Sequence, residues 1–279
     1  MSTRLPAEKI TFSFGKNWRE FVESHLTAER QQIAISTLTE FLGSPDLKGR
    51  TFLDIGCGSG LFSLAAYRLG ADKIVSVDVD PYSVESTTIL RQLAGSPNTW
   101  TVLQGSILDQ RFNASLGPAD VVYAWGSLHH TGAMWDAIRN AEALIAPGGL
   151  FFLAIYNKVE GRGSSDYWRK IKRLYNRSST PVKRTMEVAH IVRYHVIPDL
   201  LRLRNPYVRY RNYKARGMSQ WIDVRDWLGG YPYEAAAAGD IFKFCTRDLG
   251  LVLVNLRTVN TLGCNEFLFR KQRHREATA

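Results

Sequence analysis

Three glycines in the first third of the chain are the residues whose type and spacing point most directly to chemistry. They occupy alternate positions directly after the short apolar run of residues 51–55: Gly56, Gly58 and Gly60. Glycine lets the backbone approach a ligand closely, and a helix over residues 61–69 would direct free N–H groups at an anionic group. Asp78 closes the next β-branched run, where a carboxylate suits the two hydroxyls of a ribose. The stretch therefore predicts a site for a ligand that contains adenosine.

The spacing of these glycines indicates which ligand of that kind is bound. The dinucleotide fingerprint is G-x-G-x-x-G, whereas this loop reads G-x-G-x-G, and Asp54 precedes its first glycine by two residues. The pattern Asp-x-Gly-x-Gly-x-Gly resembles motif I of the class I S-adenosylmethionine (SAM)-dependent methyltransferases. The resemblance implies that the loop, with Cys57, holds the methionine part of SAM and that Asp78 holds its ribose. Further cofactor contacts implied in this way are Val79, Ser106, Ile107 and Trp125. An ordinary strand-to-helix turn is the alternative.

Strands that alternate with helices indicate that this loop belongs to a parallel sheet. The expected strands are residues 51–55, 73–77, 98–103, 120–124 and 150–156, followed by a hairpin of 251–256 and 265–269. This order resembles the α/β, Rossmann-like sheet of the class I methyltransferases, with seven mostly parallel strands, an antiparallel last strand and helices on both faces. Ligands of such sheets bind at the carboxyl ends of the strands, so we expect one site there.

Composition and the extent of the resemblance divide the chain into a core and three additions. The expected units are a core of residues 46–157 and 233–270, an N-terminal helical extension of 1–45, a basic helical insertion of 158–232 after the fifth strand and a polar tail of 271–279. We expect Trp18 to contact the cofactor from an N-terminal lid formed around residues 14–18. The alternative is that the extension, helical over 17–42, only covers the sheet.

The segment after the fourth strand contains a candidate general base. Residues 124–135, AWGSLHHTGAMW, resemble the Leu-His-His segment of small-molecule methyltransferases, such as those of quinone biosynthesis and of sugar and natural-product O-methylation. Methyl transfer needs chiefly alignment, but a hydroxyl is a weak nucleophile that benefits from a base. His129 or His130 could be that base, with His130 preferred, or both could only hydrogen-bond within the loop. Tyr156 and Asn157 end the fifth strand and are candidates for binding the acceptor.

The basic character of the chain is concentrated in the insertion. The net charge is +10, and residues 157–232 contain 17 Lys and Arg against 6 Asp and Glu, together with seven Tyr and three Trp. We expect helices over 166–175, capped by Ser165, and over 181–197, with Pro198 breaking or kinking the second. An irregular stretch over 215–234 should wall the acceptor pocket through Arg216 and Tyr231.

Four interpretations of the insertion stay open. It could be a cap over a small-molecule pocket, or a surface that binds RNA through basic and aromatic side chains. It could lie on an anionic membrane to reach a lipid-linked substrate, or be a solvated basic face without a partner. The nucleic-acid interpretation is the less favoured one, because residues 125–128 are Trp-Gly-Ser-Leu and not the Asn-Pro-Pro-Tyr type of enzymes that methylate nucleobase amines.

Length and composition set further bounds. The chain has 279 residues, of which 45% are hydrophobic, and no run of about 18 apolar residues predicts a membrane span. The N-terminus lacks an apolar signal region, so we expect a cytoplasmic location. The cysteines lack metal-ligand spacing, so free thiols and no metal site are expected at Cys57, Cys245 and Cys264.

These features favour a SAM-dependent methyltransferase that O-methylates a small polar metabolite, glycan or natural-product scaffold. The alternatives are an RNA methyltransferase that uses the insertion, a methyltransferase of a lipid-linked substrate at a membrane surface, and a SAM-binding module without chemistry.

Overall fold

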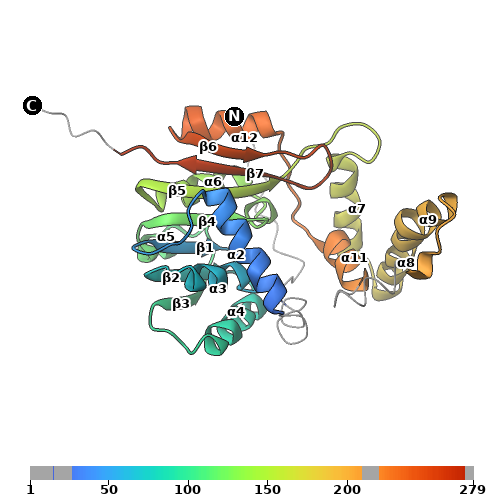
Figure 1. Cartoon of the computed structure of the whole chain (residues 1–279). Helices are drawn as coiled ribbons and strands as arrows, with labels where there is room; N and C mark the ends of the chain where they lie inside the picture. The colour runs from blue at the N-terminus through green and yellow to red at the C-terminus, as the bar shows by residue number, and fades with distance from the viewer. Residues whose placement is uncertain (1–14, 16–26, 209–219, 274–279) are drawn as a thin grey trace, which may run out of the picture.

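A seven-stranded mixed sheet organises the computed structural model, which describes residues 15, 27–208 and 220–273 (Figure 1). The strand order is β3-β2-β1-β4-β5-β7-β6, and β7 is antiparallel to both of its neighbours. The strands are β1 (Thr51–Ile55), β2 (Lys73–Asp78), β3 (Trp100–Gln104), β4 (Ala119–Trp125), β5 (Ile145–Tyr156), β6 (Val252–Arg257) and β7 (Cys264–Arg270). The predicted parallel sheet with an antiparallel hairpin at one edge is confirmed.

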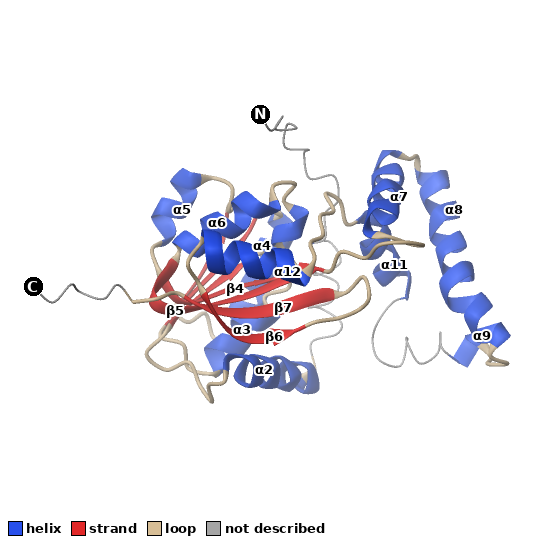
Figure 2. Cartoon of the chain, turned by 90° about the horizontal axis from the view of Figure 1, so that it is seen from above, coloured by secondary structure: helices blue, strands red, loops and turns tan. Residues whose placement is uncertain are grey.

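Helices cover both faces of the sheet (Figure 2). One face carries α2 (Ala28–Leu42), α3 (Leu61–Arg68) and α4 (Pro81–Leu93), and the other carries α5 (Gln110–Leu116), α6 (Met134–Ala143) and α12 (Ala238–Lys243). Successive side chains of a strand point to opposite faces, so Phe52 packs with Leu38 of α2 while Leu53 packs with Ile138 of α6 in the second core. Both cores fix β1, and with it the loop that follows.

Some predicted boundaries are wrong, and each has a local cause. Helix α5 was not predicted; it begins where the Asp109 side chain accepts hydrogen bonds from the N–H groups of Arg111 and Phe112. The composition of residues 234–248 also predicts a helix, but the helix begins at Ala238, because Ala236 is extended and pairs with Asn157 in a β-bridge.

The insertion folds into a separate group of helices, called the arm below, which lies at the right of the sheet in Figure 1. The first helix of the arm, expected to be capped by Ser165, is capped by Ser164, because the Ser164 side chain accepts a hydrogen bond from the N–H of Tyr167. The helix expected to end near Ile197 continues past Pro198, because a π-helical turn precedes the proline. The stretch expected to be irregular contains a helix from Gln220. The described arm elements are α7 (Ser165–Arg177), α8 (Thr180–Ile191), the π-helical turn (Val192–Val196), α9 (Ile197–Leu201) and α11 (Gln220–Gly229).

The arm has an apolar core of its own. It consists of buried aromatic and aliphatic side chains from α7, α11 and the residues that follow α11: Trp168, Tyr175, Val224, Leu228, Tyr231 and Tyr233. Glu187 of α8 is buried beside this core and accepts hydrogen bonds from Tyr175 and Arg184. In the described part of the chain, no helix combines the length and the apolar content that crossing a bilayer requires.

Candidate active site

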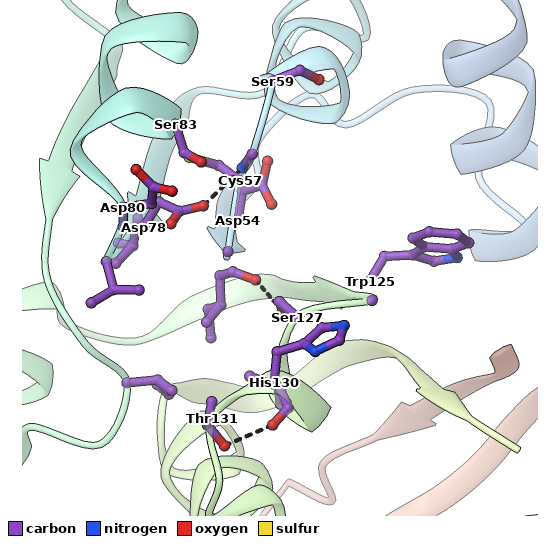
Figure 3. A pocket seen from close by; sticks show the side chains of 18 of the residues that line it. Asp54, Cys57, Ser59, Asp78, Asp80, Ser83, Trp125, Ser127, His130 and Thr131 are labelled. Carbon is purple, nitrogen blue, oxygen red and sulfur yellow. Dashed lines mark hydrogen bonds between the residues drawn. The ribbon is translucent and has the colours of Figure 1, made fainter. Parts of the chain in front are cut away.

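A cavity of about 810 Å³ opens at the carboxyl ends of β1, β2 and β4 and extends to α11 of the arm. Two groups of lining residues can be separated. The glycine-loop end comprises Gly56, Gly58, Asp78, Asp80 and Ile107, and the arm end comprises His130, Tyr156, Asp226, Trp227 and Tyr231. Figure 3 shows Asp78, Asp80 and Ser83 grouped beside the loop at Cys57, with Trp125 and His130 on another side of it. The cavity is therefore shared by the core and the insertion.

The loop after β1 needs glycine at Gly56 for two reasons. Its φ of 76° lies in the left-handed region, which side chains disfavour. A Cβ at this position would also collide with the side chain of Ser127, whose hydroxyl donates a 2.7 Å hydrogen bond to the carbonyl of Ile55. Gly60, with φ 80°, packs against Thr87 of α4 and does not line the cavity. A Cβ at Gly60 would lie only 2.9 Å from the Cα of Thr87. Gly56 and Gly60 thus differ in role.

Asp78 is held at the end of β2 with its carboxylate already oriented. Its Oδ2 accepts the N–H of Gly58 at 3.0 Å, and its Oδ1 accepts the N–H of Asp80 at 2.9 Å. Burial raises the pKa of this carboxyl, and the two N–H donors oppose that rise. A carboxylate fixed at a strand end and lining the cavity can accept hydrogen bonds from vicinal hydroxyls.

A chain of hydrogen bonds behind the loop fixes Asp54. The indole of Trp100 donates to Ser76 at 2.8 Å, the hydroxyls of Ser76 and Ser63 are 2.6 Å apart, and Ser63 donates to Oδ2 of Asp54 at 2.6 Å. Because an indole can only donate and each hydroxyl has one proton, the bonds all run from Trp100 toward Asp54. Burial raises the pKa of Asp54 to about 7. The serines of this chain belong to no motif and were not among the residues predicted for the site.

The loop after β3 forms an apolar wall near Asp78. Ser106 and Ile107 of this loop line the cavity, together with Val79 of the loop after β2. The carbonyl of Ile107 accepts hydrogen bonds from the side-chain amides of Asn113 at 2.7 Å and Asn140 at 2.9 Å. These two amides anchor the loop to α5 and α6.

The two adjacent histidines have different environments. Nδ1 of His130 is 2.7 Å from the carbonyl oxygen of Pro232, which can only accept, so Nδ1 carries the proton and Nε2 carries the lone pair. His130 lines the cavity, and burial lowers its pKa to about 4. His129 does not line the cavity. It is fully buried, its ring centroid is 4.0 Å from that of Tyr156, and within the described part of the chain neither ring nitrogen has a hydrogen-bond partner.

The arm end of the cavity receives three side chains from one face of α11: Asp223, Asp226 and Trp227. Their spacing of three and four residues is the helical signal that could have identified them, had α11 been predicted. Behind them lies Lys172 of α7, whose ammonium group is 4.0 Å from the ring centroid of Trp227 and donates to the Trp227 carbonyl. Burial lowers the pKa of Lys172 to about 7.

The structure distributes the candidate residues from the sequence in three groups. Those that line the cavity are Asp54, Gly56, Cys57, Gly58, Asp78, Val79, Ser106, Ile107, Trp125, His130, Tyr156 and Tyr231. Those that lie outside its lining are Gly60, His129 and Asn157. Asn157 donates instead to the carbonyls of Val259 and Thr261 and so holds the turn before β7. Trp18 and Arg216 fall outside the residues that the structure describes.

Comparisons with known proteins agree with this geometry. A family model described as a methyltransferase domain matches residues 26–201. The ribosomal protein L11 methyltransferase of Photobacterium profundum is 42% identical over 133 residues, which are 48% of this chain and 42% of that protein. A ubiquinone biosynthesis O-methyltransferase of Methylobacterium sp. is 33% identical over 121 residues, 42% of this chain and 45% of that protein. The chain thus matches these relatives over less than half of their length.

Solved structures share the fold across almost the whole chain. Magnesium protoporphyrin IX methyltransferase from Synechocystis PCC 6803, with bound S-adenosyl-L-homocysteine (SAH), has a TM-score of 0.54 at 14% identity. The match covers 93% of this chain and 95% of that chain. The N-methyltransferase NodS from Bradyrhizobium japonicum WM9, in complex with SAH, has a TM-score of 0.51 at 13% identity, and the match covers 93% of this chain and 99% of that chain. The chain belongs to the methyltransferase domain family, and its cofactor is SAM.

The glycine-loop end of the cavity fits this cofactor. Gly56 and Gly58 leave the backbone uncovered, the Asp78 carboxylate is suited to ribose hydroxyls, and Val79 with Ile107 provides an apolar wall of the kind that an adenine ring contacts. A volume of about 810 Å³ is near the upper end of ligand pockets, roughly 300–1,000 Å³, so the arm end leaves room for an acceptor.

Proposed function

We propose that the protein transfers a methyl group from SAM to a hydroxyl oxygen of a small polar metabolite, glycan or natural-product scaffold bound at the arm end of the cavity. The observation that carries the proposal is that one cavity contains both the Asp78 carboxylate and the His130 ring. The arm end adds the aromatic side chains of Tyr156 and Trp227 and the carboxylates of α11, a combination that suits a polyhydroxylated acceptor.

When bound, SAM supplies a methyl group activated on a sulfonium. In the proposed mechanism, His130 accepts the acceptor's hydroxyl proton on Nε2. Its pKa of about 4 keeps the ring neutral at pH 7 but makes it a weak base. A weak base suffices if the proton moves as the new O–C bond forms, because the hydroxyl proton becomes far more acidic at that stage. The carbonyl of Pro232 stabilises the imidazolium through Nδ1.

Transfer of radiolabel from SAM tests this proposal and does not require a chosen acceptor. A cell extract is incubated with the protein and labelled SAM and is then separated into small molecules, RNA, protein and organic-soluble lipid. We expect label in an alkali-stable ether among the small molecules. Label confined to RNA or protein would overturn the small-molecule acceptor, and labelled amines would overturn O-methylation.

The His130→Asn variant tests the base. We expect its methyl transfer to fall by about 100-fold, within the usual range for general-base catalysis, while SAH binding and the melting temperature stay near those of the wild type. Full activity of this variant at neutral pH would remove His130 from the mechanism and leave the acceptor proposal intact.

An RNA acceptor is the second candidate, favoured by the excess of basic residues in 157–232. It requires that RNA binding weakens steeply with added salt, because phosphate contacts release counterions. In the extract experiment, an RNA acceptor predicts label in the RNA fraction that is lost on ribonuclease treatment. This result separates the RNA candidate from the small-molecule candidate.

A further inference from the structure

The tip of the arm exposes large apolar side chains to an unusual degree. Within residues 200–208, Leu203 is 98% exposed, Leu201 81%, Tyr207 65% and Leu200 56%. Leucines scattered singly on a surface are common, but a contiguous group of this kind marks an interaction site. The tip is therefore a candidate docking surface.

The tip is also held in one shape. The carbonyl of Asp199 accepts the N–H groups of Arg202 at 3.1 Å and Arg204 at 2.8 Å, and the N–H of Leu203 donates to the carbonyl of Leu200 at 3.0 Å. Leu203 has a φ of 54°, in the left-handed region that leucine rarely adopts. These bonds fix a turn that leaves Leu201 and Leu203 in solvent.

The charges around these leucines are of one sign. Residues 188–208 contain Arg193, Arg202 and Arg204, all exposed, and a single acidic residue, Asp199, which is only 2% exposed. The nearest preceding acid, Glu187, is also buried and is paired with Arg184 and Arg225. The surface that this tip presents is thus apolar and cationic, with its carboxylates withdrawn from solvent.

We propose that the arm tip docks on an anionic lipid surface, with Leu201 and Leu203 inserted among the acyl chains and Arg202 and Arg204 at the headgroups. Apolar side chains interleaved with arginines are the combination that binds such surfaces. A second copy of the chain would bring like charges together. RNA contacts would call for several stacking aromatics, whereas this tip exposes three leucines and one aromatic, Tyr207. The proposal goes beyond methyl transfer and does not depend on the acceptor.

Docking would also orient the arm end of the cavity. Helix α11, which lines that end, packs against both α7 and α8, and α8 continues through the π-helical turn into α9 and the tip. A membrane-bound tip would therefore hold the arm end near the lipid surface, where an amphipathic acceptor would be concentrated.

Co-sedimentation of the 279-residue protein with vesicles tests the proposal. The two vesicle types are phosphatidylcholine alone and phosphatidylcholine with phosphatidylglycerol. We expect binding to the anionic vesicles, weakened by added salt, and little binding to the neutral ones. The Arg202→Gln, Arg204→Gln double variant should bind about 25-fold more weakly, since each basic residue near such a surface contributes about fivefold. The Leu201→Ser, Leu203→Ser double variant should lose roughly tenfold or more.

Matched controls come from the core of the same chain. Lys243→Gln with Arg247→Gln removes two exposed charges of α12 and the π-helical turn that follows it, and Leu93→Ser removes an exposed leucine of α4. We expect both controls to bind vesicles like the wild type. Equal binding by the tip variants, or equal binding to the neutral vesicles, would overturn the proposal. Binding of polyuridine without binding to the anionic vesicles would favour RNA. Concentration-dependent dimers that are lost in the leucine variant, again without vesicle binding, would favour a second copy. Either outcome overturns the proposal.

Discussion

The backbone N–H of Gly15 donates a 3.0 Å hydrogen bond to Oδ2 of Asp80, a residue 65 positions further along the chain. Asp80 caps α4 through Tyr82 and lines the glycine-loop end of the cavity. Through Gly15, the N-terminal extension therefore reaches the rim of the glycine-loop end of the cavity. The lid predicted from residues 14–18 stays a prediction, because its aromatic side chains lie outside the described residues.

Substituting Gly15 by alanine should weaken cofactor binding. A Cβ at Gly15 would lie 2.6 Å from the Cβ of Tyr82 and 2.8 Å from Oδ1 of Asp80, so the chain must shift away from the rim. We expect the Kd for SAH, measured by calorimetry, to rise by about tenfold, the loss of roughly one hydrogen bond to a charged group. Gly239→Ala is the matched control, because a Cβ at Gly239 meets nothing within 4 Å. Unchanged affinity in Gly15→Ala would show that the contact does not support binding.

Removing the carboxylate of Asp78 should nearly abolish cofactor binding. Asp78→Ala takes away the proposed acceptor for the ribose hydroxyls and the carboxylate that accepts the N–H groups of Gly58 and Asp80. We expect a loss of about 3 kcal/mol, which is a rise of more than 100-fold in the Kd for SAH. Asp46→Asn, at a half-exposed residue that does not line the cavity, should bind SAH normally. A Kd within threefold of wild type for Asp78→Ala would contradict the ribose assignment.

Asp54 should make the protein less stable as the pH rises through the acidic range. Its pKa in the folded state is raised to about 7 from 3.8, so between about pH 4 and 7 the folded state binds more protons than the unfolded state. Stability contributed by the protonated form is therefore present below about pH 4 and is lost as the pH approaches and passes 7. Asp54→Asn keeps an oxygen acceptor for Ser63 and should flatten this part of the melting-temperature profile. An identical slope in both proteins would exclude Asp54 as its source.

Lys172 should make the protein more stable as the pH rises, over a higher pH range than the one in which Asp54 acts. Burial lowers its folded-state pKa to about 7 from 10.5, so between about pH 7 and 10 the unfolded state binds more protons and stability rises with pH. Lys172→Met preserves the packing on Trp227 without a titratable group and should remove that rise. Thermal melts of both proteins at neutral and at alkaline pH provide the comparison, with Lys170→Met on the exposed side of α7 as the control. A rise that persists in Lys172→Met would refute the assignment.

The sequence was most informative where one local pattern specifies both structure and ligand. Residues 51–60 predicted β1 and a glycine loop at the cavity near Asp78, because close approach of the backbone requires glycine whatever the rest of the fold does. The chain from Trp100 through Ser76 and Ser63 to Asp54 was not predictable, because its members come from four different elements and no spacing connects them.

The arm end was less predictable for a different reason. Gly229 and Gly230 suggested an irregular segment, whereas Val224 and Leu228 stabilise α11 by packing on α7, and that contact between distant parts of the chain outweighs local propensity. The difference between His129 and His130 also depends on tertiary structure. Both belong to one short 3-10 turn, and the hydrogen bond that orients the His130 ring is accepted by Pro232, a hundred residues later.

The arm's separate core has a consequence for how this enzyme can diverge. Because Trp168, Val224 and Leu228 belong to a cluster that is distinct from the two cores of the sheet and meets β5 at Tyr156, we expect substitutions on the cavity-facing side of α11 to leave the wall around Asp78 undisturbed. Substitutions in α11 can therefore change the acceptor that is methylated without changing the glycine-loop end of the cavity. Homologues should share the stretch from Asp54 to Leu108 and differ most in α11, and an arm exchanged between two of them should transfer acceptor preference with it.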